Sequence, residues 1–437
     1  MVSRRRFLGQ AAGAVAVAGV GGAVSGKGEA DSTPMPIALI GCGGMGNGHL
    51  SLLAPRKDVR IVYLCEPDAN RLAQSMKSVE AAGQKGVKAV KDMRTILDDK
   101  SVRAVWIATP DHWHAPAAIL AADAGKHVYV EKPCSHNLRE GRLMIEAARR
   151  NKVVMQVGTQ SRSTAHVIQA MKRLGEGAIG KVLVAKAWNS QRRGNIGHAK
   201  PSEPPKHLDY DLWLGPVPHV PFQSNMLPGI WRWWYAFGVG DIGNDGVHDI
   251  DLARWGLGVT EHHSTITALG GKYFFDDDQQ WPDTQYVVFE YPGDGRIGHK
   301  RQLIFEQRTW SPYVQEGLEN GDAFYGTEGM MILGKSGGYQ LFGPRNKLIE
   351  HVKAGSPDLA AHHNNFLACI RNGARPNADI EINHLTTSLC HLANIATRVG
   401  RVVRFDPKSE SIPDDSEAAA MQRREYRAGH WATPKGA

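Results

Sequence analysis

The sequence has 437 residues, of which 42% are hydrophobic and 22% are charged. Such values are typical of an ordinary globular protein with two domains. The formal net charge is +8, and removing Arg4, Arg5 and Arg6 with an N-terminal segment leaves +5. The remaining Lys and Arg residues form no long or aromatic-interleaved stripe. The composition therefore argues against a nucleic-acid partner.

The cysteines and paired histidines give no pattern of a disulfide framework or a metal site. The cysteines are odd in number, widely scattered and without a CxxC pair: Cys42, Cys65, Cys134, Cys369 and Cys390. We expect them to be small buried side chains. The two His-His pairs are His262-His263 and His362-His363. Adjacent side chains of a helix or strand point in different directions, so we predict no metal site.

Residues 1–30 have the pattern of an export signal. Charged Arg4-Arg5-Arg6 precede Phe7-Leu8 and an apolar run over 11–24 that ends in small residues. This run is too short and too rich in Gly for a membrane span. The paired arginines resemble a twin-arginine signal, which predicts periplasmic export of a folded protein and no stable membrane insertion after signal removal. A Sec signal or an uncleaved anchor is the alternative, and cleavage after either Ser25 or Ala30 fits.

A dinucleotide-binding pattern follows the signal. An apolar strand over 36–40 runs into a G-x-G-x-x-G sequence and then a helical stretch over 49–53. Gly41 permits the tight turn, Gly43 lets the backbone approach a pyrophosphate, and Gly46 allows close packing of helix and strand. The start of the helix offers free N–H groups to the phosphates.

A second strand over 59–65 ends at Glu66, about twenty residues after Gly46. A carboxylate at this position accepts hydrogen bonds from the adenosine ribose and repels a 2′-phosphate, which favours NAD over NADP. The alternative is that Glu66 is a solvated acid at a strand end.

Strand and helix patterns continue to alternate. A strand over 102–108 ends at the polar sequence 109–114, a helix follows over 116–124 with Pro116 in its first turn, and a strand over 126–130 ends at Glu131-Lys132-Pro133. Ligands of open parallel sheets bind beyond the carboxyl ends of the strands. The sequence therefore predicts an α/β fold with a doubly wound parallel sheet.

These motifs together resemble the glucose–fructose oxidoreductase, inositol dehydrogenase and rhizopine-catabolism (Gfo/Idh/MocA) family. The resemblance covers nearly all of the chain after the signal and rests on the glycine motif, Thr109-Pro110-Asp111-x-Trp113-His114, 124–128, Glu131-Lys132-Pro133, 158–160, 240–244, His248-x-x-Asp251 and 325–329. It implies that a nicotinamide cofactor, expected to be tightly bound NAD, contacts Gly41, Gly43, Met45, Gly46, Glu66, Thr109, Pro110, Trp113, His114, Glu131 and Lys132.

The resemblance also implies the domain organisation. We expect a Rossmann domain over 34–156, a substrate and oligomerisation domain over 157–408, and a C-terminal tail over 409–437. The second domain is implied to be α+β with an open, mainly antiparallel sheet that forms a dimer or tetramer interface. In agreement, 181–188, 264–269, 285–291 and 302–308 have the composition of strands.

Two residues are the leading catalytic candidates. Lys132 at a strand end can hydrogen-bond the reacting hydroxyl, and burial would lower its pKa. A structural salt bridge with Glu131 is the alternative. His248 opens a helical run over 247–255 and, titrating near neutral pH, suits a proton acceptor in alcohol oxidation. The resemblance assigns both roles.

The chain departs from the family pattern at Asn244, where many members carry aspartate four residues before the histidine. Asparagine can bind a sugar hydroxyl but cannot act as a base. Asp241 and Asp245 flank it, and either can supply the missing carboxylate. We therefore place Asn244 and Asp245 among the catalytic candidates and Asp241 among the substrate contacts.

Further substrate contacts are predicted at Gln160, Arg162, Trp231 and Trp234. The Trp-Arg-Trp-Trp sequence over 231–234 can stack on sugar rings or form core of the second domain.

The predicted function is oxidoreduction of a sugar, polyol or glycoside hydroxyl with bound NAD. An exported enzyme has no free pool of NAD to exchange with and needs a closed redox cycle. It can oxidise one sugar and reduce another, or it can be a NAD-dependent glycosidase that uses transient oxidation, elimination, hydration and re-reduction. A non-catalytic sugar-binding protein is a third reading.

Overall fold

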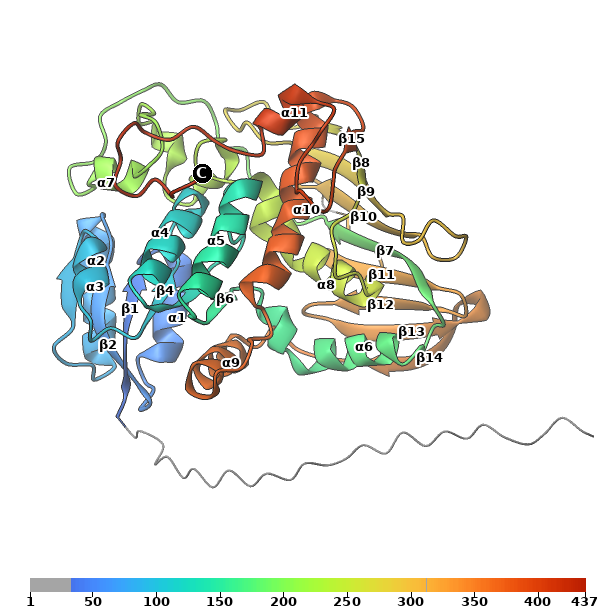
Figure 1. Cartoon of the computed structure of the whole chain (residues 1–437), viewed down its shortest axis with the longest axis horizontal. Coiled ribbons are helices and arrows are strands. Elements are labelled where there is room, and N and C mark those ends of the chain that lie inside the picture. Colours follow the sequence, from blue (N-terminus) through green and yellow to red (C-terminus); the bar gives the residue numbers. More distant parts are fainter. Residues whose placement is uncertain (1–32, 312) are drawn as a thin grey trace, which may run out of the picture.

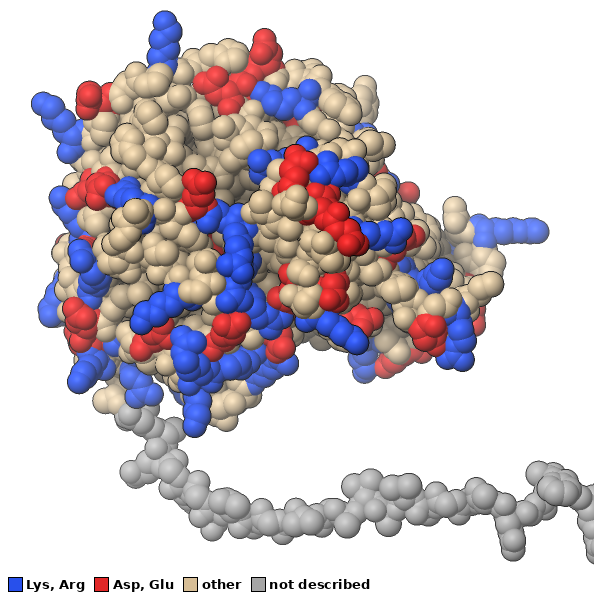
Figure 2. Space-filling view, turned by 45° about the horizontal axis from the view of Figure 1, so that its top comes forward, with Lys and Arg blue, Asp and Glu red and all other residues tan. Residues whose placement is uncertain are grey.

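The computed structural model describes residues 33–311 and 313–437, which form two sheets lying side by side (Figure 1). The predicted signal over 1–30 lies outside the described residues. Within the described ranges, no helix combines the length and apolar character needed to cross a membrane. Basic and acidic side chains are interspersed over the face shown in Figure 2.

The first sheet is parallel and has the order β3-β2-β1-β4-β5-β6. Its strands are β1 (Met35–Ile40), β2 (Val59–Cys65), β3 (Lys88–Val90), β4 (Ala104–Ile107), β5 (His127–Val130) and β6 (Met155–Val157). The order reverses between β1 and β4, so the loops after these strands diverge and leave a crevice at their carboxyl ends. The predicted doubly wound Rossmann sheet is confirmed.

Helices cover both faces of this sheet. One face carries α3 (Arg94–Asp98), α4 (Asp111–Asp123) and α5 (Leu138–Arg150), and the other carries α1 (Gly44–Leu53), α2 (Ala69–Ala81) and α9 (Leu359–Asn372). Successive side chains of a strand point to opposite faces, so Leu39 packs with α1 while Ile40 packs toward α4. The helix α9 shows that a late part of the chain completes the first core.

The start of α4 differs from the prediction. The helix begins at Asp111, directly after Pro110, so Pro116 lies inside the helix rather than in its first turn. Because proline has no N–H, the carbonyl of His112, four residues earlier, loses its partner in the helix. Arg424 of the C-terminal tail supplies the missing donor at 2.8 Å.

The second sheet has the order β14-β13-β12-β11-β7-β10-β9-β8-β15. Its strands are β7 (Val182–Asn189), β8 (Thr265–Gly271), β9 (Thr284–Tyr291), β10 (Arg301–Arg308), β11 (Asn320–Gly326), β12 (Met330–Gly334), β13 (Gly338–Gly343), β14 (Lys347–Val352) and β15 (Val403–Arg404). Neighbouring strands are antiparallel except β7 and β10, which are parallel. The predicted, mainly antiparallel second sheet is confirmed.

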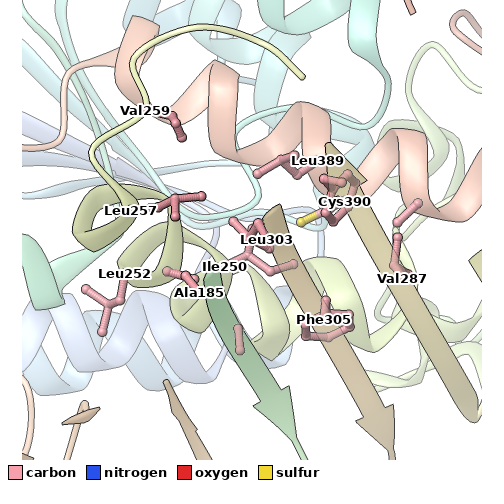
Figure 3. Packing of buried hydrophobic residues seen from close by; sticks show 14 of the residues in the cluster. Ala185, Ile250, Leu252, Leu257, Val259, Val287, Leu303, Phe305, Leu389 and Cys390 are labelled. Atoms are coloured by element: carbon pink, nitrogen blue, oxygen red, sulfur yellow. The ribbon is translucent and has the colours of Figure 1, made fainter. Parts of the chain in front are cut away.

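One face of the second sheet packs against α6 (Ala165–Gly175), α8 (Val247–Leu257) and α10 (Ile380–Val399). Figure 3 shows Ile250 of α8 and Leu389 of α10 directed toward Leu303 and Phe305 of β10. All four side chains are buried. Each such side chain contributes about 1.5–3 kcal/mol to stability, which fixes α8, and with it His248, against the sheet.

Two further segments lie beside the carboxyl edge of the first sheet. The cover segment, residues 201–236, contains α7 (Tyr210–Leu214) and short 3₁₀ turns at Ser224–Met226 and Ile230–Trp233. After α11 (Ser416–Ala420), the chain returns across the molecule toward α7 and ends near α4 and α5 (Figure 1). Other single turns are Gln160–Ser163, Pro344–Asn346 and the π-helix Ile242–Gly246.

Candidate active site

The glycine loop after β1 has the geometry of a phosphate cradle. Gly41 has φ +97°, and a Cβ there would lie 2.5 Å from the Ala108 carbonyl oxygen. A Cβ on Gly46 would lie 2.0 Å from the Gly41 oxygen. Only glycine fits either position. Gly43 precedes α1 without a side-chain cap, so the first N–H groups of the helix face the cavity and fit a pyrophosphate.

Glu66, at the end of β2, braces this loop. One carboxylate oxygen accepts the Cys42 N–H at 2.7 Å and the other accepts the Asp68 N–H at 3.1 Å. Glu66 is only 7% exposed and lines the cavity, so it is not a solvated strand-end acid. Burial raises the pKa of its carboxyl, and the two N–H donors oppose this shift.

The polar cluster after β4 connects the Rossmann sheet to the cover segment. The ring of His114 bridges the carbonyls of Thr109 and Pro133 at 2.9 and 2.6 Å. The indole of Trp113 donates to the carbonyl of Trp213 in α7 at 2.9 Å. These contacts fix the cluster at the edge where ligands of parallel sheets bind.

Glu131 directly follows β5 and lines the cavity at the carboxyl edge of the first sheet. Its Oε1 bonds His49 at 3.1 Å. Burial raises the pKa of Glu131, but the His49 contact and the charge of Lys132 outweigh it and lower that pKa to about 2. The acid is thus ionised and fixed by α1, and the described residues show no ion pair between it and the Lys132 ammonium.

Lys132 lines the cavity and reaches the second domain. Its ammonium donates a hydrogen bond to the backbone carbonyl of Asn244 in the π-helix. Burial lowers the pKa of Lys132, with a smaller contribution from the Arg232 charge, while Glu131 opposes the shift. A desolvated lysine of lowered pKa suits the proton handling of a hydroxyl group.

The Asn244 side chain is held from both sides. Its amide N–H donates to Asp241 at 3.0 Å, and its oxygen accepts from Arg232 at 2.7 Å. Asp241 also accepts from Asn189 and Arg193 and is 1% exposed. Asp241 therefore orients Asn244 from behind, whereas Asn244 and Arg232 line the cavity.

Asp245 is the carboxylate with the larger electrostatic effect on His248, ahead of Glu131. It accepts hydrogen bonds from Asn320 at 2.6 Å and from Lys335 at 3.1 Å. The Asp245 charge raises the pKa of His248, but burial, followed by the charges of Lys335 and Lys132, lowers it to about 3. The imidazole is therefore neutral at pH 7, contrary to the expectation that it titrates near neutral pH.

Behind this group lies a buried acidic pair. Lys335 also donates to Asp249 at 3.1 Å. Burial raises the pKa values of both Asp249 and Asp322. No hydrogen-bond partner of the Asp322 carboxylate is found in the described part of the chain.

The predicted substrate residues, and the catalytic candidates Asp245 and His248, divide between the cavity and the protein interior. Trp231 lines the cavity with Arg232 stacked 4.3 Å from its ring. Trp234 belongs to the core of the cover segment and donates to the Asn225 carbonyl at 3.3 Å. Gln160, Arg162, Asp241, Asp245 and His248 do not line the cavity.

Arg162 has a structural partner. Its guanidinium forms two hydrogen bonds to Asp251 at 2.6 and 2.8 Å, and both side chains are buried. This ion pair holds α8 to the Gln160–Ser163 turn. Because its guanidinium is engaged by Asp251, Arg162 is not free to bind a sugar in this arrangement.

The cavity has a volume of about 740 Å³ and joins the glycine loop to Lys132 and Asn244. Its extent suits an elongated ligand together with a smaller one. Of the predicted cofactor residues, all except Gly46 line it. Lining residues that the motifs do not predict include Arg71, His207, Leu208, Phe222 and Trp431. They lie on α2, the cover segment and the tail, far from the motifs in sequence.

One cluster outside the cavity offers three metal-ligand atoms: His262, His384 and Glu410. Both imidazoles bond the same Glu410 oxygen, at 2.8 and 3.1 Å, and Arg142 forms a two-point ion pair with that carboxylate. The atoms that could bind a metal are therefore already engaged in hydrogen bonds with one another. The positive charge of the Arg142 guanidinium also disfavours a metal cation at this position. The expected absence of a metal stays a prediction.

The fold and the cavity define a protein that binds a dinucleotide on a Rossmann domain and places a second α/β domain over it. Family profiles match both parts. Residues 35–159 match the oxidoreductase family (GFO_IDH_MocA) with an NAD-binding Rossmann fold, and 179–292 with 316–433 match its C-terminal alpha/beta domain. The chain belongs to this oxidoreductase family.

Curated relatives include named dehydrogenases. Levoglucosan dehydrogenase of Pseudarthrobacter phenanthrenivorans is 32% identical over 225 residues, 51% of this chain and 51% of that enzyme. This chain thus aligns with about half the length of that relative. The scyllo-inositol 2-dehydrogenase (NAD(+)) of Bacillus subtilis is 25% identical over 78% of this chain and 87% of that enzyme.

Solved structures share the fold. Levoglucosan dehydrogenase in complex with NADH has a TM-score of 0.65 at 20% identity, covering 85% of this chain and 99% of that chain. Aldose-aldose oxidoreductase from Caulobacter crescentus, complexed with glycerol, has a TM-score of 0.64 at 18% identity, covering 85% and 100%.

Proposed function

We propose that this protein is an exported, NAD-dependent oxidoreductase that acts on a hydroxyl group of a sugar, polyol or glycoside. The proposal rests mainly on one contact: the Lys132 ammonium donates a hydrogen bond to the Asn244 carbonyl at one end of the cavity. The glycine loop lies at the other end of the same cavity. The names of the relatives, levoglucosan dehydrogenase and inositol dehydrogenases, support a carbohydrate substrate.

The residues present suit a division of tasks. When bound, nicotinamide supplies a hydride acceptor for the substrate carbon. Lys132 holds the reacting oxygen, and the fixed amide of Asn244 and the guanidinium of Arg232 bind neighbouring hydroxyls. His248, with a neutral imidazole, accepts the hydroxyl proton, and the Asp245 charge opposes the burial that disfavours the protonated ring. The aromatic face of Trp231 packs on the sugar.

The cofactor is proposed to be NAD rather than NADP, and tightly bound. The buried Glu66 carboxylate supports this choice, because it accepts hydrogen bonds from a ribose diol and repels a 2′-phosphate. Export by the twin-arginine route rests on the residues 1–30 and suits a protein that folds around its cofactor first.

A homo-oligomer, a dimer or tetramer, is proposed to form through the outer face of the second sheet. Support comes from large side chains left exposed there, among them Leu269 of β8, Tyr286 of β9 and Tyr325 of β11. Light scattering on the purified protein tests this association, and a monomer carrying all three residues contradicts it.

A second candidate function is a NAD-dependent glycoside hydrolase. In this reaction the substrate hydroxyl is oxidised, the ketone acidifies the adjacent C–H, the glycosidic group leaves, water adds, and the ketone is reduced again. The same Lys132 and His248 serve it. The predicted export, away from free NAD, favours such a closed cycle.

The deciding experiment follows the near-ultraviolet absorbance of the nicotinamide in the purified protein while sugars and glycosides are added. A change that persists until a second substrate resets it supports the oxidoreductase. Cleavage of a glycoside over many turnovers, with the absorbance returning unaided, supports the hydrolase. Sugar binding with neither change, unaltered by Lys132→Met, supports a non-catalytic sugar-binding protein.

A further inference from the structure

The C-terminal strap, residues 421–437, is fastened to the first domain by buried polar contacts. Arg424 pairs with Glu140 of α5 at 2.6 Å and donates to the His112 carbonyl that Pro116 leaves free. The hydroxyl of Tyr426 donates to the same Glu140 carboxylate at 2.7 Å. Arg424 is nearly buried and Glu140 fully so. Such a paired, desolvated contact fixes the position of the strap on α4 and α5.

The same strap is joined to the cover segment. The Arg427 N–H donates to the Pro216 carbonyl at 2.7 Å, and its guanidinium donates to Val217 at 3.2 Å and pairs with Asp211 of α7 at 2.5 Å. The strap therefore bridges the helices α4 and α5 of the Rossmann domain and the cover segment (Figure 1).

Beyond this bridge, Trp431 enters the wall of the cavity. It lines the cavity beside Lys91, Asp92 and Met93, which follow β3. Its ring lies 4.7 Å from the Arg94 guanidinium and 5.8 Å from the Trp113 ring. The next residue, Ala432, is 1% exposed, so the strap is anchored on both sides of the tryptophan.

Backbone hydrogen bonds also hold the cover segment to the first domain near Glu66. The Ala69 N–H donates to the His207 carbonyl at 2.9 Å, and the Asp209 N–H donates to the Pro67 carbonyl at 3.0 Å. These bonds hold the cover segment against the turn after β2 that contains Glu66. The adenosine end, defined by Glu66 and the residues after β3, thus lies between the cover segment and the strap.

We propose that the C-terminal strap completes the cofactor site, with Trp431 as a wall of its adenosine end, and that it retains the bound dinucleotide. The inference rests on the proposed function, because it assumes that the cavity binds NAD. Release of the nucleotide then requires the contacts between the strap and the cover segment to open. A nucleotide held in this way stays with one protein molecule through many turnovers, as an enzyme without a supply of free NAD requires.

The test measures nucleotide exchange rather than turnover. The purified full chain is loaded with radiolabelled NAD, chased with excess unlabelled NAD, and the label that stays bound is followed by gel filtration. We expect Trp431→Ala to release the label at least ten-fold faster than the wild type. Asp211→Asn, which removes an ion pair at a side chain that is 78% exposed, is expected to speed release about two- to five-fold.

Two further variants make the comparison specific. Trp431→Phe keeps an aromatic wall and is expected to release more slowly than Trp431→Ala. Tyr273→Ala removes an aromatic side chain that is 69% exposed on the second domain and is expected to leave release unchanged. Far-ultraviolet circular dichroism and thermal melting identify any variant that fails to fold.

Equal release rates in the wild type, Trp431→Ala and Asp211→Asn overturn the role of the strap while leaving NAD binding intact. Should Trp431→Ala not fold, an unchanged rate in Asp211→Asn is sufficient to overturn it. A wild-type protein that binds no labelled NAD at all overturns both this inference and the proposed function.

Discussion

The ammonium of Lys132 donates a hydrogen bond to the backbone carbonyl of Asn244. The donor follows β5 of the first sheet, and the acceptor lies in the π-helix that leads into α8 of the second domain. The contact therefore joins the two domains at the cavity and places the lysine beside a rigid amide. Single-turn π-helices occur often at functional sites.

Replacement of this lysine is the first test of its role. We expect Lys132→Met to lower turnover by at least about 10²-fold, because the reacting hydroxyl loses its hydrogen-bond partner while the apolar stem is kept. Bound NAD, measured by absorbance per protein, should be unchanged. Lys172→Met is the control, since Lys172 lies on α6 away from the cavity and its side chain is 73% exposed. Undiminished turnover in Lys132→Met contradicts the assignment.

The neutral state of His248 leads to a prediction about pH. Burial and nearby cations lower its pKa from 6.5 to about 3, so the free enzyme keeps an unprotonated imidazole throughout pH 5–9. We expect kcat/KM, which reports ionisations of the free enzyme, to show no His248 limb near pH 6.5. His248→Gln should lower turnover by about 10²-fold or more across the range. A limb at pH 6.5 that disappears in His248→Gln would contradict the buried, neutral assignment.

Glu66 tests the choice of cofactor. Glu66→Ala removes the carboxylate that faces the cavity and also frees the N–H groups of Cys42 and Asp68. We expect NAD affinity, measured by calorimetry on nucleotide-free protein, to fall about ten-fold or more, and NADP affinity to fall less or to rise. Unchanged NAD affinity would remove the reason for preferring NAD.

Much of the first domain could be predicted because its signals are local. The glycine loop, Glu66 and the polar residues after β4 and β5 each follow a short apolar strand directly, and parallel strands bring such loops to one edge. The strand predicted over 59–65 coincides with β2 (Val59–Cys65). The local sequence and the parallel arrangement of the strands are therefore enough to place these residues at the edge of the sheet.

The rest depended on contacts between distant residues. Arg162 is of a residue type that often binds sugars, but in the fold it forms an ion pair with Asp251, which lies 89 positions away in the sequence. Trp231 and Trp234 are alike in sequence, and only packing places one at the cavity and the other in the core of the cover segment. Lys335, whose charge adds to the effect of burial on the pKa of His248, and Trp431 belong to no motif. The pKa of His248 followed from burial, which the sequence pattern does not show.

Arg162 and Asp251 give a prediction that separates structure from substrate binding. Arg162→Ala removes the two-point partner of the buried Asp251 carboxylate, which keeps the Thr386 hydroxyl at 2.7 Å and Arg254 at 4.0 Å, so we expect the free energy of unfolding to fall by about 3 kcal/mol. Arg162→Lys should not restore it, because lysine cannot form the two-point pair with Asp251. Arg60→Ala, at an exposed position, is the control. If the Arg162→Ala protein were as stable as the wild type and had a raised KM, Arg162 would be a substrate-binding residue and the structural assignment would be wrong.

Acid sensitivity follows from buried histidines held neutral in the folded protein. Burial lowers the pKa values of His112 and His391 to about 3, and that of His362 to about 4. In the unfolded chain these groups titrate near pH 6.5, so between pH 6.5 and the folded pKa the unfolded state binds more protons. Stability is therefore full above pH 6.5 and is lost as the pH falls, by up to about 1.4 kcal/mol per pH unit for each histidine.

We expect urea denaturation at pH 7.5, 6.0 and 5.0 to show a free energy of unfolding that falls by several kcal/mol. His391→Gln should flatten this dependence, because one proton-binding group is removed from the unfolded chain. His198→Gln is the matched control: His198 is exposed, and its contact with Asp278 raises its pKa, so its removal should not flatten the dependence. A free energy of unfolding that stays constant from pH 7.5 to 5.0 would mean that these imidazoles gain protons in the folded protein, and hence that the interior around α4 and α10 admits water.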